Sequence, residues 1–147
     1  MSTKHTNKPN HDGNIREVQP FHGLLDKEGH IYSNWGLSRT TKPAVYVEPI
    51  SYADVQAVAG DGERFPTPVH PVGSLLSVTS TIVNDGGTIM CTRKLDEIIG
   101  LEHDELGRHV VRVQAGCRLK KLNMWLQALG ERRALINRAS ASTGKLL

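Results

Sequence analysis

A strand, a helix and a second strand follow one another in the first half of the chain, and this order restricts the fold more than any other feature. Residues 44–48 are mostly β-branched or aromatic, and Pro49, which cannot donate to a sheet, ends the run. Ser51 and Asp54 have the spacing of a helix N-terminal cap, and Gly60–Asp61–Gly62 marks the end of the helix. Two strands joined through a helix are usually parallel. The pattern predicts an α+β fold with a small mixed sheet and strand–helix–strand units.

The second strand, at residues 67–72, is rich in proline. Pro66, Pro68 and Pro71 each lack the backbone N–H that a sheet ladder needs, so we expect an edge strand or one that is only partly paired. The strand leads into Gly73–Ser77, a loop of glycine, serine and leucine. Backbone N–H groups in such a loop can converge on one point, where a phosphate is the usual ligand. An ordinary connection between two strands is the alternative interpretation.

Four shorter patterns organise the rest of the chain. Residues 84–87 predict a turn, and the apolar residues between 95 and 99 have helical spacing. Residues 109–115 alternate as in a strand, with Val111, Val113 and Ala115 on one face. Residues 118–129 predict the clearest helix of the chain. Its apolar stripe and terminating glycine are Leu119, Leu122, Trp125, Leu126, Leu129 and Gly130.

The charge distribution argues against a nucleic-acid-binding surface. The 147 residues include 18 Lys or Arg and 15 Asp or Glu, a formal net charge of +3. Residues 1–130 hold 14 charges of each sign, so the whole excess lies after Gly130. A neutral body with a basic tail offers no extended surface for phosphates. We therefore expect no nucleic-acid partner.

Three features favour a soluble cytoplasmic protein. Cys91 and Cys117 form no CxxC pair and stand in apolar surroundings, which is typical of buried, reduced thiols in a reducing compartment. Residues 1–8 lack the apolar core of a secretory signal. No apolar run approaches the length of a membrane span, so we expect no membrane partner.

Most signatures of catalysis are absent from the sequence. The seven histidines show no HxxxH or HxH spacing, so we expect no metal site. Neither a Gly-x-Ser-x-Gly elbow nor a Gly-x-Gly-x-x-Gly dinucleotide fingerprint is present. Residues 143–145 resemble the end of a P-loop, but Ala139 and Leu146 stand where that motif needs glycine and a hydroxyl residue. No catalytic residue can be named, and the loop at 73–77 is left as the candidate cofactor site.

Six segments follow one another along the chain, at residues 43–55, 69–74, 85–90, 95–99, 111–117 and 119–126. Their order resembles the N-terminal part of a PCMH-type FAD-binding domain, found in the flavoprotein superfamily of vanillyl-alcohol oxidase and p-cresol methylhydroxylase. Asn34–Trp35, ahead of the first strand, is similar to the sugar-alcohol and aldonolactone oxidase branch of that superfamily.

The resemblance implies a non-covalently bound FAD and a set of residues that hold it. The loop after the second strand wraps the pyrophosphate with backbone N–H groups, Pro49 lies near the adenine end, and Gly116 lies where the sheet approaches the flavin. Many relatives carry Gly-His at the positions of Leu75 and Leu76, where the histidine can bond to the flavin, and leucine cannot. The implied cofactor-binding residues are Gly73, Ser74, Leu75, Leu76, Ser77, Pro49 and Gly116.

The resemblance also implies a division of the chain and a function. Residues 1–31 are expected to be a polar flexible leader, residues 32–130 part of a PCMH-type domain, and residues 131–147 a basic tail that does not match the family. The implied function is the FAD-binding portion of a flavin-dependent oxidoreductase acting on CH–OH donors such as sugar alcohols or lactones. The family places catalytic residues in a substrate domain, which is expected to be missing or supplied by a partner chain. The alternative is a truncated, non-catalytic remnant that does not bind FAD stably.

Overall fold

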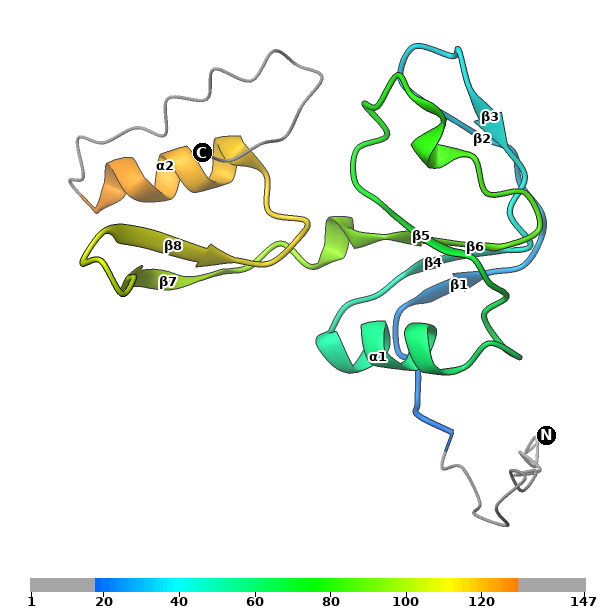
Figure 1. The fold of residues 1–147 in the computed structure, drawn as a ribbon, viewed down its shortest axis with the longest axis horizontal. Helices are drawn as coiled ribbons and strands as arrows, with labels where there is room; N and C mark the ends of the chain where they lie inside the picture. Colours follow the sequence, from blue (N-terminus) through cyan, green and yellow to red (C-terminus); the bar gives the residue numbers. More distant parts are fainter. Residues whose placement is uncertain (1–17, 130–147) are drawn as a thin grey trace.

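The computed structural model of the chain describes residues 18–129 and shows an α+β fold (Figure 1). Within this range a four-stranded sheet is accompanied by two two-stranded sheets, two α-helices and two short 3-10 helices. None of the helices in this range is long and apolar enough to cross a membrane. The elements are β1 (Leu24–Asp26), β2 (Tyr32–Ser33), β3 (Thr40–Thr41), β4 (Val45–Glu48), α1 (Tyr52–Gly60), β5 (Val69–Val72), η1 (Ser80–Ile82), β6 (Thr88–Cys91), η2 (Thr92–Lys94), β7 (Ile98–His103), β8 (His109–Val113) and α2 (Leu119–Ala128).

The four-stranded sheet is mixed, as predicted, and has the strand order β1-β4-β6-β5. β4 and β5 both pair in parallel with β6, whereas β1 pairs antiparallel with β4. The two strands of the strand–helix–strand unit are therefore parallel but are not neighbours, because β6 lies between them. The proline-rich strand β5 occupies an edge, which confirms the prediction made from its missing backbone donors.

Helix α1 begins at the predicted cap. Ser51 is the N-cap residue, and its side chain accepts a hydrogen bond from the backbone N–H of Asp54 at 3.1 Å. The Asp54 carboxylate is buried and accepts hydrogen bonds from the backbone N–H groups of Ile50 (2.9 Å) and His22 (2.8 Å). This aspartate thus joins the start of the helix to the segment that leads into β1.

The sheet is covered by apolar side chains on both faces. β4 alternates, so Val45 and Val47 pack on one face with Val58 and Phe65, and Tyr46 lies on the other. The second cluster contains Tyr46, Val72, Ile89 and Cys91. Cys91 and Cys117 are both free cysteines; Cys91 is buried as predicted, whereas Cys117 is half-buried, so the prediction of two buried thiols is wrong for Cys117.

Strand β1 lies inside the stretch that was expected to be a leader. Leu24–Asp26 pairs with β4 along the sheet edge, although Leu24 and Leu25 are exposed. The strand therefore depends on backbone pairing with β4, which a polar composition does not reveal. Residues 1–17 of the expected leader lie outside the described residues.

The helical spacing read at residues 95–99 is wrong. Ile98–His103 forms β7, which pairs antiparallel with β8, and its side chains alternate between half-buried and exposed. A turn at Asp104–Gly107, with Gly107 at φ +72°, joins the two strands. Pairing across this hairpin outweighs a short apolar pattern that fits either a helix or a strand.

The predicted strand at 109–115 ends two residues early. β8 stops at Val113, and the next side chain, Gln114, turns inward and accepts a hydrogen bond from the Glu97 backbone N–H at 3.0 Å. Ala115 is exposed, so the expected apolar face of Val111, Val113 and Ala115 is wrong at its last position. The polar group at 114 takes the buried place because it satisfies a backbone donor.

The other local predictions are confirmed. Residues 84–87 contain a turn with Gly86 at φ +75°, and the preceding residues form the 3-10 helix η1. Helix α2 covers Leu119–Ala128 and buries Leu122 and Leu126 from the predicted apolar stripe. Gly130, its predicted stop, lies outside the described residues.

Candidate functional site

The three parallel strands β4, β5 and β6 have their carboxyl ends on the same side of the sheet, and the candidate loop begins there. β4 ends at Glu48, β5 at Val72 and β6 at Cys91, so their carboxyl ends meet (Figure 1). Ligands of sheets with parallel strands bind outside the carboxyl ends of the strands. The residues that follow, Pro49, Gly73 and Thr92, are therefore placed at the edge where a ligand is expected.

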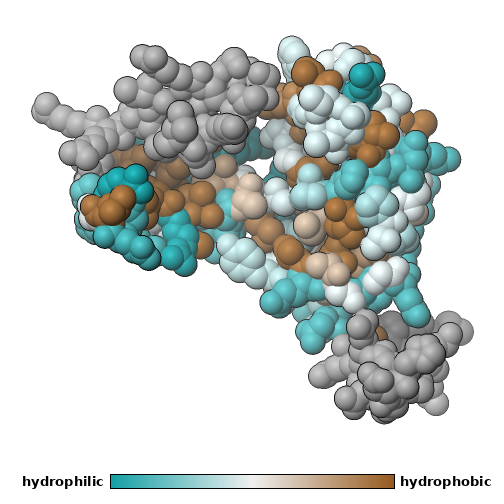
Figure 2. Space-filling view, in the orientation of Figure 1, coloured by the Kyte–Doolittle hydropathy of each residue, from teal (hydrophilic) through white to brown (hydrophobic). Residues whose placement is uncertain are grey.

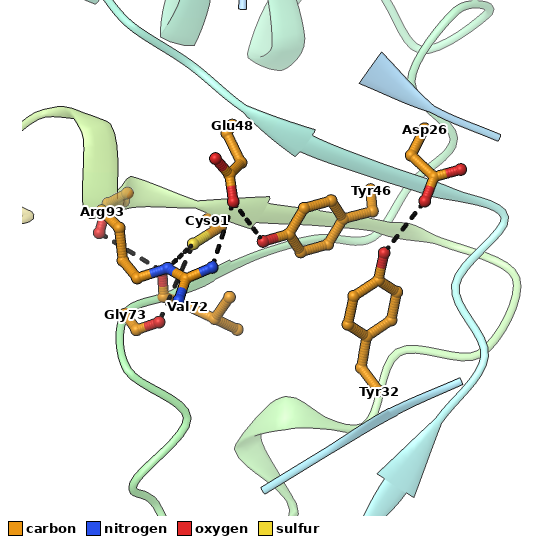
Figure 3. Close-up of polar contacts among 9 residues, drawn as sticks. Asp26, Tyr32, Tyr46, Glu48, Val72, Gly73, Cys91 and Arg93 are labelled. Atoms are coloured by element: carbon orange, nitrogen blue, oxygen red, sulfur yellow. Dashed lines mark hydrogen bonds and ion pairs between the residues drawn. The ribbon is translucent and has the colours of Figure 1, made fainter. Parts of the chain in front are cut away.

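A chain of polar contacts ties the three strand ends together (Figure 3). The Tyr46 hydroxyl donates to Glu48 Oε1 at 2.8 Å, and Arg93 Nη2 lies 3.2 Å from the same oxygen. Arg93 Nε donates to Cys91 Sγ at 3.2 Å, and this thiol faces the Gly73 carbonyl oxygen at 3.9 Å. Burial raises the pKa of Tyr46 well above its ordinary value, so its hydroxyl stays a hydrogen-bond donor. The first residue of the loop is thus connected to the ends of β4 and β6.

The candidate loop has an inward and an outward side. Leu75 packs against the apolar cluster below it, while Gly73, Ser74 and Leu76 are exposed. Leu75 has φ +56°, in the left-handed region that glycine adopts more easily than leucine. A loop that holds leucine in this conformation needs contacts that fix its backbone.

Asn34 and Trp35 supply those contacts. The backbone N–H of Trp35 donates to the Leu75 carbonyl at 2.8 Å, and Asn34 Nδ2 donates to the Ser77 carbonyl at 2.9 Å. Asn34 is only 1% exposed and lies in the connection between β2 and β3. The dipeptide singled out by the sequence resemblance therefore holds the candidate loop directly.

Backbone donors of the loop are left free. Within residues 18–129, none of the N–H groups of residues 73–78 donates a hydrogen bond. Residues 73, 74, 76 and 78 are exposed, so the donors at these four positions are open to a ligand. Several unpaired N–H groups along a short loop suit an anion such as a phosphate.

The space beside Gly73 is open. A Cβ atom built on Gly73 would meet nothing within 4 Å, and its φ is not in the left-handed region. Contacts within the described residues therefore do not explain a glycine here, whereas close approach of a ligand to the backbone would. The Ser77 hydroxyl is instead occupied, since it bonds to the hydroxyls of Thr79 (2.8 Å) and Thr81 (3.0 Å).

Apolar side chains surround the loop. Leu76 is 47% exposed and Val78 is 59% exposed, and Trp35, which bonds to the loop through its backbone, is 76% exposed. Figure 2 shows that apolar patches interrupt the polar surface of the described residues. Single exposed apolar residues are ordinary, but several beside free backbone donors suit a ligand with both an anionic group and a ring system.

Pro49 and Gly116 lie in different surroundings from the loop. Pro49 is fully buried at the end of β4. Gly116 packs its backbone against Thr92, where a Cβ would collide with the Thr92 carbonyl oxygen and lie 2.9 Å from the Leu95 carbonyl oxygen. Close packing within the chain thus accounts for the glycine at 116, and the expected contacts of both residues with a cofactor stay predictions.

One group of potential metal ligands occurs in the described part of the chain. Ligand atoms of Asp26, Glu28 and His30 lie within 4.8 Å of one another at the surface. His30 Nδ1 already pairs with Asp26 Oδ2 at 2.8 Å, and Tyr32 donates to the same oxygen at 3.2 Å. These contacts account for the arrangement, and the expectation of no metal site stays a prediction.

Two comparisons relate this chain to known proteins. A family profile described as "FAD binding domain" matches residues 43–140. D-arabinono-1,4-lactone oxidase of Eremothecium gossypii is 30% identical over 102 residues. These residues are 69% of this chain and 19% of the relative, so the chain spans about a fifth of that protein's length. Asn34 and Trp35 precede the segment that the family profile matches.

Proposed function

Because the chain belongs to the FAD-binding domain family, we propose that it is the FAD-binding portion of a flavin-dependent oxidoreductase that acts on CH–OH donors. The observation that carries the proposal is the row of free backbone N–H groups at residues 73–78, at the carboxyl edge of the parallel strands. FAD, when bound, accepts a hydride from the carbon that carries the substrate hydroxyl. The residues of this chain bind and orient the cofactor.

The loop at Gly73–Ser77 is the proposed binding site for the FAD pyrophosphate. Its free donors and the open space beside Gly73 suit a ligand that approaches the backbone closely. Pro49 at the adenine end and Gly116 near the flavin complete the proposed set. The family match favours this interpretation over a remnant that does not bind FAD.

The cofactor is proposed to be held without a covalent bond. Leu76 stands where the histidine that bonds to the flavin is expected, and its hydrocarbon side chain has no nucleophilic atom. The binding free energy must then come from hydrogen bonds and apolar contacts alone. Acid precipitation tests this, because a non-covalent flavin remains in the supernatant while a covalent one sediments with the protein.

The substrate is proposed to be a sugar alcohol or a lactone-like compound. The relative that covers these residues is named a D-arabinono-1,4-lactone oxidase. Residues 32–130 are proposed to form part of the FAD-binding domain, and substrate contacts are proposed to come from a separate domain or a partner chain. The match covers only 19% of the relative's length, which leaves room in that protein for a separate substrate domain and so supports this proposed division.

Ligand-dependent melting of the purified chain tests the proposal. FAD at about 100 times its Kd should stabilise the fold by about 2.7 kcal/mol. ADP, which retains the pyrophosphate and the adenine, should also raise the melting temperature, whereas riboflavin, which lacks both, should raise it much less. A colourless protein whose melting temperature is unchanged by FAD would refute the proposal and leave the non-binding remnant as the better interpretation.

A further inference from the structure

We propose that Asn34 is a positioning residue of the cofactor site: its side chain directs the backbone N–H of Val78 toward the FAD pyrophosphate, beside the Leu76 N–H that the Trp35 backbone directs. The inference rests on the proposed function and deepens it. It extends the site beyond Ser77 to Val78, and it includes the β2–β3 hairpin, which precedes the family-matched residues 43–140.

The direction of the donors follows from the direction of the anchored carbonyls. A trans peptide is planar, so its C=O and N–H groups point in opposite directions. The Leu75 carbonyl faces the Trp35 N–H at 2.8 Å, and the N–H of the same peptide unit belongs to Leu76. The Ser77 carbonyl faces Asn34 Nδ2 at 2.9 Å, and its peptide partner is the N–H of Val78. Both N–H groups therefore point away from the hairpin that holds the two carbonyls.

The two donors belong to exposed residues. Leu76 and Val78 are exposed, whereas Leu75 and Ser77, whose carbonyls are held by the hairpin, are half-buried. Neither the Leu76 nor the Val78 N–H donates a hydrogen bond within residues 18–129. Two neighbouring free donors on the exposed side form a binding site for two oxygens of one anion.

Asn34 is itself held rigidly, which a positioning residue requires. Its Oδ1 accepts from the Arg39 backbone N–H at 3.0 Å, and its Nδ2 also donates to Ser38 Oγ at 3.0 Å. The hairpin is fixed on the sheet because Tyr32 stacks on Tyr46 with ring centroids 4.5 Å apart (Figure 3). The position of the Ser77 carbonyl is thus set by a buried side chain with all its partners in place.

Amide chemical shifts of the full 147-residue chain test the donor assignment. Titration of the ¹⁵N-labelled protein with inorganic pyrophosphate, and separately with FAD, should shift the Leu76 and Val78 amides most among residues 73–78. Binding that shifts other amides and leaves these two unchanged would overturn the inference while the proposed function stands. A protein that responds to neither ligand would overturn both.

A pair of matched variants tests the role of Asn34. Asn34→Leu is close to asparagine in size, removes the donor to Ser77 and adds no negative charge beside the anion site. Asn84→Leu is the control, because Asn84 is also buried and donates to two backbone carbonyls, those of Pro68 and Thr88, each at 2.8 Å. These carbonyls lie at the amino ends of β5 and β6, opposite the loop.

Both variants should lower the melting temperature, since each removes the side-chain hydrogen bonds of a buried asparagine. Only Asn34→Leu should weaken the binding of pyrophosphate and FAD, on the order of tenfold, the equivalent of about one hydrogen bond. It should also abolish the ligand-induced shift at Val78, whereas the shift at Leu76 should remain, because the Trp35 backbone N–H still holds the Leu75 carbonyl. Equal binding by the two folded variants, with the Val78 shift retained in Asn34→Leu, would show that Asn34 acts only on stability and would overturn the inference.

Discussion

Replacement of Gly116 by alanine separates two explanations for this glycine, contact with the flavin and close packing inside the chain. An added Cβ would collide with the Thr92 carbonyl oxygen and would lie 2.8 Å from the Thr92 carbonyl carbon. Both are backbone atoms, so no side chain can turn aside to make room. The Gly116 N–H also donates to the Leu95 carbonyl at 2.8 Å, and Leu95 is only 2% exposed. We therefore expect Gly116→Ala to destabilise the protein without any cofactor present.

The expected magnitude combines two terms. Overpacking of a tight site costs about 1–3 kcal/mol, and loss of the hydrogen bond to Leu95 adds about 1 kcal/mol. A total of about 3 kcal/mol corresponds to a fall in melting temperature of about 6–12 °C for a chain of this size.

The fluorescence of Trp125, in helix α2, provides the assay. Trp35→Phe removes the other tryptophan and keeps the backbone N–H that donates to Leu75, so it is a suitable background for thermal and urea unfolding. Gly100→Ala is the control, because Gly100 lies in β7, has no positive φ, and a Cβ there would meet nothing within 4 Å. The control should change the free energy of unfolding by no more than about 0.5 kcal/mol. Equal unfolding of Gly116→Ala and Gly100→Ala in the absence of FAD would refute the packing explanation.

Two further predictions concern Asp54 and Leu75. Burial pushes the pKa of Asp54 upward, but hydrogen bonds from the backbone of His22 and Ile50 outweigh it and hold the pKa below 3.8. The ionised carboxylate should therefore stabilise the fold above about pH 4, and this contribution should be lost as the pH falls further. The difference in the free energy of unfolding in urea between wild type and Asp54→Asn should shrink below about pH 4. A difference that stays constant with pH would contradict this. At Leu75, where φ is +56°, Leu75→Gly should be more stable than Leu75→Ala by about 1 kcal/mol in chemical denaturation, and the reverse order would contradict the left-handed conformation.

The sequence predicted those elements whose signals are local. The cap at Ser51 and the proline-rich edge strand β5 follow from a few adjacent residues. A helix cap is a hydrogen bond between residues close in sequence, and each proline lacks its own backbone N–H. Strand β7 was mistaken for a helical pattern, since two adjacent isoleucines at 98–99 fit either period and pairing with β8 decides. β1 escaped prediction for a related reason, because its three residues are a strand only through pairing with β4.

The position of the candidate loop was predictable, but the contacts that shape it were not. The loop follows a strand and is rich in glycine and serine, which is a local signal. The bond from Asn34 to Ser77 spans 43 residues, and the bond from Trp35 to Leu75 involves backbone atoms alone. Neither hydrogen bond produces a periodic pattern in the sequence. Only the resemblance of Asn34–Trp35 to an oxidase branch marked these residues, and it did not indicate that they touch the loop.

The anchored carbonyls explain how a loop with two leucines can keep a shape suited to an anion. Leucine at φ +56° is disfavoured, so Leu75 weakens the intrinsic preference of the loop for this conformation. The hydrogen bonds from Trp35 and Asn34 act on the backbone and do not depend on the side chains at 75 and 77. A leucine at position 75 should therefore change the stability of the loop more than the direction of its donors. The proposed non-covalent attachment, with leucine at position 76, and the proposed anion site are thus compatible in one loop.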